Sequence, residues 1–179
     1  LERQTKNISL AKRYNLFPIR DLAAYEAYVK LESTFWTAYE LKYTDDKKDY
    51  NLIKEYDSSG NNKKMKRLID YFLGFVLPAD GLICENIIDN FLKTAKTYEE
   101  VIFFSCQIHN ETIHSITYGL VAQTLIPELQ DQIRVFEMVD NLPCHKAKMQ
   151  LMEKYKSGDW SLAERYVAFA CAEGIFFTI

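Results

Sequence analysis

The chain has 179 residues and a formal net charge of −3, from 22 Lys and Arg against 25 Asp and Glu. Hydrophobic residues make up 48% of it and Gly and Pro number only 6 and 4, which excludes a disordered, collagen-like or low-complexity chain. A chain of this length buries one sizeable core, so a single domain over residues 1–179 is expected. The mild acidity argues against nonspecific nucleic-acid binding, because such binding needs clustered positive charge.

The four cysteines form no C-x-x-C pair, and three of them stand among apolar neighbours. This pattern indicates buried thiols in a reducing compartment such as the cytoplasm, not a disulfide framework. No stretch of 18 apolar residues is apparent, so a membrane span is not expected. The first six residues resemble no signal peptide and do not begin with Met, so the natural N-terminus is expected to lie further upstream.

Apolar residues recur every three or four positions along most of the chain, which predicts helices. In chain order, the expected helices cover residues 21–36, 65–77, 82–95, 99–125, 129–142, 146–155 and 161–177. Gly and Pro fall where these helices are expected to stop, and the polar stretch 44–64 predicts a surface loop containing a short helical piece. The helix over 99–125 is apolar on nearly all sides, so it is expected to be central and buried. Because sustained period-two alternation is missing, the predicted fold class is all-α.

The expected central helix contains Glu111 and His114, three residues apart and therefore on one helix face. A carboxylate and an imidazole that project together from a buried helix are one way to hold a metal ion in a helical bundle. By itself the pair is more often a surface pair or a core histidine with a hydrogen-bond partner. Tyr118 follows on the same face, and Glu173 interrupts an apolar run over 167–177. Because buried carboxylates need partners, the pattern favours a metal site.

Five segments stand in order with compatible spacing: Phe17–Ile19, Ser33–Ala38, Asp80–Asn86, Gln107–Tyr118 and Glu164–Phe177. They are similar to F-P-I, S-F-W-T-A, D-G-I-V-x-E-N, Q-I-x-x-E-N-I-H-S-x-x-Y and E-R-x-V-A-F-A-x-x-E-G-I-F-F. These are motifs of the small, radical-generating subunit of class I ribonucleotide reductase. The chain resembles this family over nearly its whole length.

The resemblance implies a ferritin-like helical bundle that houses a di-iron or di-manganese centre. Oxygen chemistry there makes a tyrosyl radical, and electrons pass to a large subunit that reduces ribonucleotides. Glu111 matches the bridging carboxylate, His114 an imidazole ligand of the same metal, and Glu173 a ligand of the second metal. Tyr118 matches the radical tyrosine, and Phe177 matches a residue that keeps the radical pocket dry. The resemblance also implies a dimer of small subunits, in which this chain pairs with a second copy of itself or with a related small subunit.

Lys42 stands where the resemblance, counted from the S-F-W-T-A segment, expects the first acidic ligand. A protonated lysine has no lone pair for a metal. An ammonium group roughly 4 Å from another charge interacts with it by about 4 kcal/mol at an effective dielectric of about 20. In the favoured explanation, Lys42 pairs with Glu111 or Glu173 and the site is metal-free. In the other, Lys42 points to solvent and a shifted acid, Glu40 or Asp45, is the ligand.

Tyr25 stands where the resemblance expects a Trp that relays an electron toward the surface, so it either carries that electron or packs a helix. The family continues for well over a hundred residues beyond the matched part and supplies two further metal ligands there. The first functional hypothesis is a ribonucleotide reductase small subunit, or a fragment of one, with an altered or metal-free radical site. The alternative is a non-catalytic paralogue that stabilises an active small subunit. A two-electron metal oxidase fits less well, because Tyr118 is retained.

Overall fold

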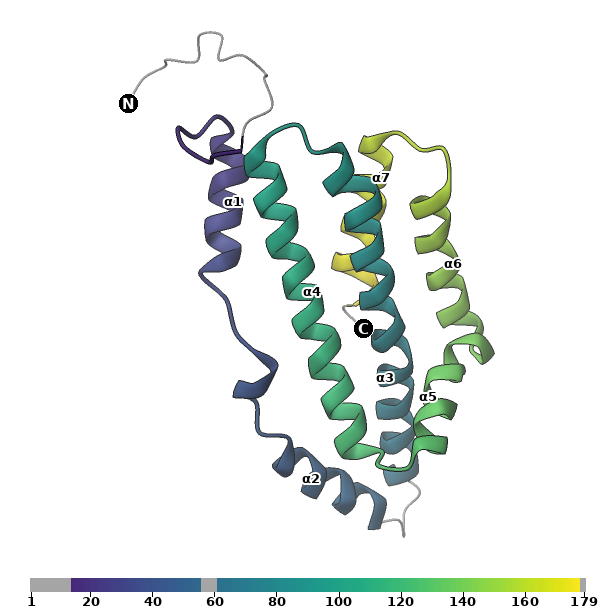
Figure 1. Ribbon diagram of the computed structural model, residues 1–179. Coiled ribbons are helices and arrows are strands. Elements are labelled where there is room, and N and C mark those ends of the chain that lie inside the picture. Colours follow the sequence, from purple (N-terminus) through teal and green to yellow (C-terminus); the bar gives the residue numbers. More distant parts are fainter. Residues whose placement is uncertain (1–13, 56–60, 178–179) are drawn as a thin grey trace.

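The computed structural model describes residues 14–55 and 61–177, and within these ranges it contains helices and no strand. The all-α prediction is confirmed. The main helices in Figure 1 are α1 (Leu22–Glu32), α2 (Tyr43–Glu55), α3 (Asn61–Asn86), α4 (Tyr98–Leu125), α5 (Leu129–Asn141), α6 (Pro143–Ser157) and α7 (Leu162–Cys171). The short elements are the 3-10 helices η1 (Ala38–Glu40) and η3 (Leu92–Thr94) and the π-helices η2 (Ile87–Phe91) and η4 (Ala172–Phe176).

Helices α3 and α4 run side by side in opposite directions and form the centre of the bundle (Figure 1). Helix α1 packs on α4, and α2 contacts both central helices at the end where α3 begins. Helices α5 and α6 pack along α3, and α7 returns beside α6. The predicted central position of the 99–125 helix is confirmed, since α4 covers almost the same residues.

Helix α3 contributes to each of three hydrophobic clusters in the part of the chain that the structure describes. Leu73 packs with α4 and α5 residues, Phe75, Val76 and Ala79 form a second cluster, and Ile83 joins a third that includes α4 and η4. The predicted break between residues 77 and 82 is wrong, because α3 continues through Pro78 and Gly81. A proline in a helix interior costs about 3 kcal/mol. Burial of several large side chains at about 1.5–3 kcal/mol each outweighs that cost.

Two further boundaries differ from the predicted ones. The first helix ends at Glu32 instead of residue 36, and the hydroxyl groups of Ser33 and Thr34 donate to carbonyl oxygens of its last turn. Most of the predicted surface loop over 44–64 is helix α2. Tyr50 of α2 is buried and donates to Asp70 of α3 at 3.5 Å, so tertiary contacts stabilise a segment with a weak apolar pattern.

One segment, Lys64–Thr94, is long and apolar enough to cross a membrane by length and composition, with a mean hydropathy of 1.4 over its best window. No such segment was expected from the sequence, in which no stretch of 18 apolar residues is apparent. It consists mainly of α3, which packs against α4, α5 and α6 and carries the buried Asp80. The core helix of a bundle meets the same criteria, so this is weak evidence for a membrane span.

Candidate metal centre

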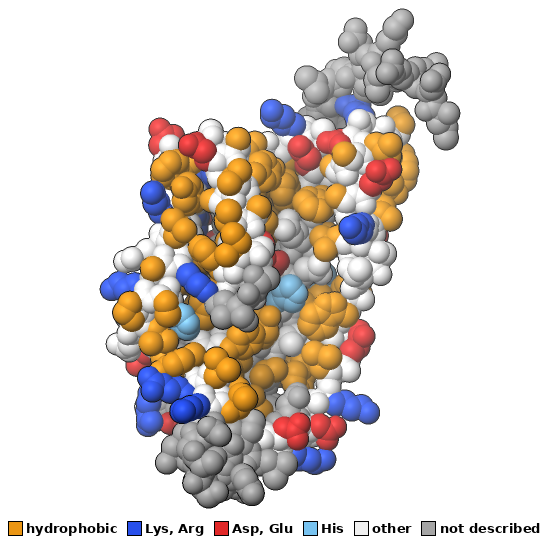
Figure 2. All heavy atoms as spheres, turned by 180° about the vertical axis from the view of Figure 1, so that it is seen from behind, with side chains coloured by type: hydrophobic (Ala, Val, Ile, Leu, Met, Phe, Trp, Pro, Cys, Tyr) orange, Lys and Arg blue, Asp and Glu red, His pale blue; other side chains and the backbone are white. Residues whose placement is uncertain are grey.

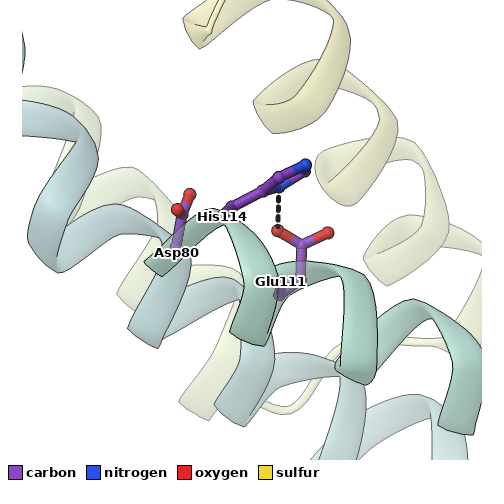
Figure 3. A group of neighbouring side chains, drawn as sticks. All are labelled: Asp80, Glu111 and His114. Atoms are coloured by element: carbon purple, nitrogen blue, oxygen red, sulfur yellow. Dashed lines mark hydrogen bonds and ion pairs between the residues drawn. The ribbon is translucent and has the colours of Figure 1, made fainter. Parts of the chain in front are cut away.

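Three side chains from the two central helices converge in the bundle: Asp80 of α3, and Glu111 and His114 of α4 (Figure 3). Each offers one ligand atom, and the three atoms lie within 4.8 Å of one another. Glu111 Oε2 lies 3.2 Å from His114 Nδ1. Asp80 is 3% exposed and Glu111 is 8% exposed, while His114 is half-buried. The three ligand atoms are close enough together to bind one metal ion.

The sequence of α4 turns Glu111 inward. The helix begins at a capping box in which Thr97 and Glu100 satisfy each other's backbone groups. Phe104 and Glu111 are both buried and lie two turns apart, so they share one helix face. The apolar contacts of that face hold the Glu111 carboxylate in the core, and His114 follows three residues later on the same side.

Glu173 lies in the π-helix η4, which continues α7. π-helical turns are rare and occur frequently at functional sites. Among the residues that the structure describes, the buried Glu173 Oε1 has no hydrogen-bond partner, and the same holds for Asp80 Oδ2. Two buried carboxylate oxygens without a partner are costly, so both are available to a cation.

The electrostatics of the cluster are dominated by its carboxylates. Burial, reinforced by the charge of Glu111, raises the pKa of both Asp80 and Glu173 to about 7, and His114 opposes this rise. The hydrogen bond to Glu111 raises the pKa of His114, against the effect of burial. A divalent cation would relieve the repulsion between these carboxylates. The mixed oxygen and imidazole donors suit iron or manganese, so the residues fit such a metal.

Tyr118 lies one turn after His114, with the two ring centroids 6.4 Å apart. Phe72 meets its ring edge-on at 6.1 Å, and Tyr118 and Phe177 both pack against the Phe75 cluster. Burial, followed by the charges of Asp80 and Glu111, raises the pKa of the Tyr118 phenol. Tyr118 is thus a neutral phenol at the edge of the carboxylate cluster, and Phe177 lies in the same apolar surroundings.

Asp80, not Lys42, is the third side chain of the cluster. Lys42 is exposed and lies just before α2, and within the described residues it forms no ion pair with Glu111 or Glu173. Favourable hydration of the ammonium group explains its outward position, because burial of a charge needs compensation. The favoured explanation, in which Lys42 replaces the metal's charge, therefore finds no support in the side-chain positions.

The alternative acids are also engaged elsewhere. Glu40 accepts from the Thr37 backbone at 2.9 Å, and Asp45 pairs with Lys48 at 3.0 Å. Asp80 was missed, although it opens the segment that resembles D-G-I-V-x-E-N. An isolated carboxylate among the apolar residues of a helix was the signal that could have identified it.

Tyr25 is half-buried on α1, where its ring contacts Phe17 at 6.2 Å and Tyr28 at 6.3 Å. Neither contact belongs to the carboxylate cluster. Trp36 instead lies beside the cluster, with its ring centroid 6.0 Å from that of His114. From the sequence, Tyr25 was expected either to carry an electron or to pack a helix, and Trp36 was given no role in the relay, although it belongs to the S-F-W-T-A-like segment.

Buried carboxylates and a histidine at the centre of a helical bundle define a candidate metal-binding bundle protein. The sequence profile described as "Ribonucleotide reductase, small chain" matches residues 13–178. The chain therefore belongs to the ribonucleotide reductase small-chain family, and the predicted resemblance is confirmed.

Curated relatives agree with this assignment. The ribonucleoside-diphosphate reductase small subunit of Plasmodium falciparum is 35% identical over 166 residues, which cover 93% of this chain and 49% of that protein. The ribonucleoside-diphosphate reductase small chain of Nicotiana tabacum is 32% identical over 166 residues, covering 93% of this chain and 48% of that protein. The chain thus spans about half the length of the curated relatives it matches.

Solved structures support the ferritin-like fold. The ribonucleotide reductase Rnr4 homodimer from Saccharomyces cerevisiae matches with a TM-score of 0.75 at 32% identity, over 92% of this chain and 50% of that one. The dimanganese(II)-NrdF of Streptococcus sanguinis matches with a TM-score of 0.78 at 20% identity, over 93% of this chain and 55% of that one. At that lower identity the second match supports the fold alone.

Proposed function

We propose that this chain is the part of a ribonucleoside-diphosphate reductase small subunit that binds metal and carries a radical on Tyr118. The observation that carries this proposal is the buried Asp80–Glu111–His114 cluster with Tyr118 one turn away. The named relatives are ribonucleoside-diphosphate reductase small chains, so ribonucleoside diphosphates are the proposed substrates of the complete enzyme.

Asp80, Glu111 and His114 would hold one ion, and Glu173 would bind a second ion beside it. A pair of iron or manganese ions, with oxygen as the oxidant, would supply the oxidising power for a one-electron oxidation of Tyr118. Four side chains are too few to complete the coordination of two metal ions, so other residues must supply the remaining ligands. The buried, partnerless oxygens of Asp80 and Glu173 support this assignment.

The surroundings of Tyr118 suit a residue that is oxidised and then protected. Its raised pKa keeps the phenol protonated at neutral pH, so oxidation must release a proton together with the electron. Phe177 helps to exclude water from the radical, since it packs against the same apolar cluster as Tyr118, and Phe72 covers one edge of the Tyr118 ring. Trp36 is the proposed point of electron entry, because its ring lies next to His114.

The proposed partners are a large reductase subunit and a second small subunit, identical or related, in the cytoplasm. Large hydrophobic side chains remain exposed on the bundle, including Leu68 and Phe72 of α3, Val167 of α7 and Ile175 of η4. Figure 2 shows hydrophobic side chains over much of the face seen from behind. Extended exposed apolar surface is typical of protein–protein contact, which supports an assembly.

Metal content per chain, measured on the protein in its natural assembly, tests this function. We expect bound iron or manganese that is lost in Glu111→Gln, because the carboxylate at the centre of the cluster is removed. We also expect a tyrosyl signal in electron paramagnetic resonance that disappears in Tyr118→Phe while the metal content stays constant.

A folded assembly without bound metal would reject the proposal. Full ribonucleotide reduction by the Tyr118→Phe assembly would reject the radical role and support the alternative, a non-catalytic paralogue that stabilises an active small subunit.

A further inference from the structure

The segment between α1 and α2 runs past α4 (Figure 1). Two consecutive aromatic residues of this segment, Phe35 and Trp36, contact histidine rings of α4. Phe35 stacks on His109 with ring centroids 5.6 Å apart and an interplanar angle of 9°. Trp36 lies against His114 with centroids 6.0 Å apart and an angle of 34°. Neighbouring residues of one segment thus contact two histidines of one helix.

The two histidines lie on different sides of α4. They are five residues apart, which corresponds to a rotation of roughly 140° around an α-helix. Phe35 contacts one of these histidines and Trp36 the other, so the two neighbouring side chains reach both sides of α4 at once. Each ring contact therefore opposes rotation or sliding of the segment about the other contact.

The ends of this segment are fixed locally. The Ser33 and Thr34 hydroxyls donate to the last turn of α1, and Tyr43 Oη donates to the carbonyl of Ala38 at 2.7 Å. Between these points lie the two aromatic residues, of which Phe35 is 54% exposed. His109 is also exposed, so hydrophobic burial contributes little to the Phe35–His109 pair. The main consequence of this stack between two exposed rings is therefore that it restricts the position of the neighbouring Trp36.

We propose that the Phe35–His109 stack is a positioning contact that holds Trp36 against His114. This inference rests on the proposed function, in which an electron enters the cluster through Trp36. In the ring contacts of the described residues Phe35 and His109 pair with each other, so their proposed role is exerted through the position of Trp36. Loss of the stack frees the segment on one side of α4, so Trp36 moves away from His114 part of the time. An aromatic pair of this kind shifts such an equilibrium by about two- to tenfold.

Acrylamide quenching of Trp36 fluorescence in the full chain tests the inference. The Trp36→Phe variant emits from Trp160 alone. Subtracting its emission from that of the unaltered chain therefore isolates the emission of Trp36. We expect His109→Ala to raise the quenching constant of Trp36 at least about twofold, and His109→Phe, which keeps an aromatic face, to restore it. Ser105→Ala, at another exposed position of α4, serves as the matched control and is expected to change nothing.

Helix content by circular dichroism and bound metal, measured in parallel, separate positioning from general damage. Unchanged helix content and metal content in His109→Ala, together with the increased quenching, support the inference. An unchanged quenching constant in His109→Ala overturns it and leaves the proposed function standing, provided that Trp36 is shielded in the unaltered chain. If Trp36 is already fully accessible in the unaltered chain, electron entry through Trp36 is rejected, and the positioning role is rejected with it.

Discussion

Asp80 and Glu111 lie opposite each other on antiparallel helices, both almost fully buried, with ligand atoms within 4.8 Å of one another and of a His114 ring nitrogen. Two carboxylates this close repel each other when both are ionised. Burial, reinforced by this repulsion, raises the pKa of Asp80 to about 7, and a bound cation would remove the repulsion. The repulsion between Asp80 and Glu111 therefore affects both the stability of the metal-free bundle and its affinity for a metal ion.

Replacement of Asp80 by Asn is expected to lower the affinity for Mn²⁺ or Fe²⁺ by more than about tenfold, because a charged ligand is lost. Calorimetric titration of the metal-free chain with Mn²⁺ measures this effect. Lys42→Ala is the control and is expected to change the affinity little, since the Lys42 side chain is exposed. A large gain in affinity on Lys42→Ala would instead restore the hypothesis that this ammonium group occupies the site.

The stability of the metal-free chain is expected to depend on pH through Asp80 and Glu173. Both carboxyl groups have a folded-state pKa of about 7, above their ordinary values of 3.8 and 4.5. The folded chain therefore holds protons that the unfolded chain has released, and this contribution to stability is lost as the pH rises from about 4 to about 7.

Asp80→Asn removes one of these groups and imitates its protonated form. Urea unfolding between pH 5 and pH 8, with a chelator present, is expected to show the variant gaining stability over the unaltered chain as the pH rises. Parallel stability curves for the two proteins would contradict the raised pKa of Asp80.

Gly74→Ala is expected to destabilise the bundle by about 1–3 kcal/mol, because overpacking forces helices apart. A Cβ atom at Gly74 on α3 would lie 2.5 Å from the backbone oxygen of Val135 on α5, which has no freedom to move alone. Thermal unfolding measures the loss.

Gly119→Ala on α4 provides the control for Gly74→Ala, since a Cβ there meets no atom within 4 Å. Its expected effect is a gain of up to about 1 kcal/mol from helix propensity. Equal effects of the two substitutions would show that α3 and α5 do not approach as closely as described.

Arg165 stabilises the connection between α6 and α7. Its guanidinium group lies within hydrogen-bond distance of Asn90 Oδ1 and of the carbonyl oxygens of Tyr155, Lys156, Gly158 and Trp160. Lysine keeps the charge but lacks the planar fork of donors, so Arg165→Lys is expected to cost about 1–3 kcal/mol.

The control for Arg165→Lys is Arg134→Lys, at an exposed residue that pairs only with Asp131 among the described ion pairs. Its effect on the urea midpoint is expected to stay within about 0.5 kcal/mol. A similar loss in both variants would argue against the specific role of the Arg165 fork.

Local signals in the sequence explain which helices were predicted well. Helices α4 and α7 begin within one residue of the predicted positions, and in the structure each begins directly after a capping box, at Thr97 and at Ser161. The break predicted near Pro78 failed because the burial of α3 on several sides outweighs the local penalty of a proline. The extent of α2 was underestimated, since only a short helical piece was expected there, because the contact of Tyr50 with Asp70 of α3 joins residues far apart in the sequence.

The sequence by itself determined the all-α class, the family and the pairing of Glu111 with His114, because helical periodicity and short motifs are local. Only the tertiary structure decided that Asp80 completes this cluster, that Lys42 faces solvent and that Trp36, not Tyr25, lies beside His114. Residues brought together by helix packing come from separate segments, and spacing along one segment carries no information about which partner another helix supplies.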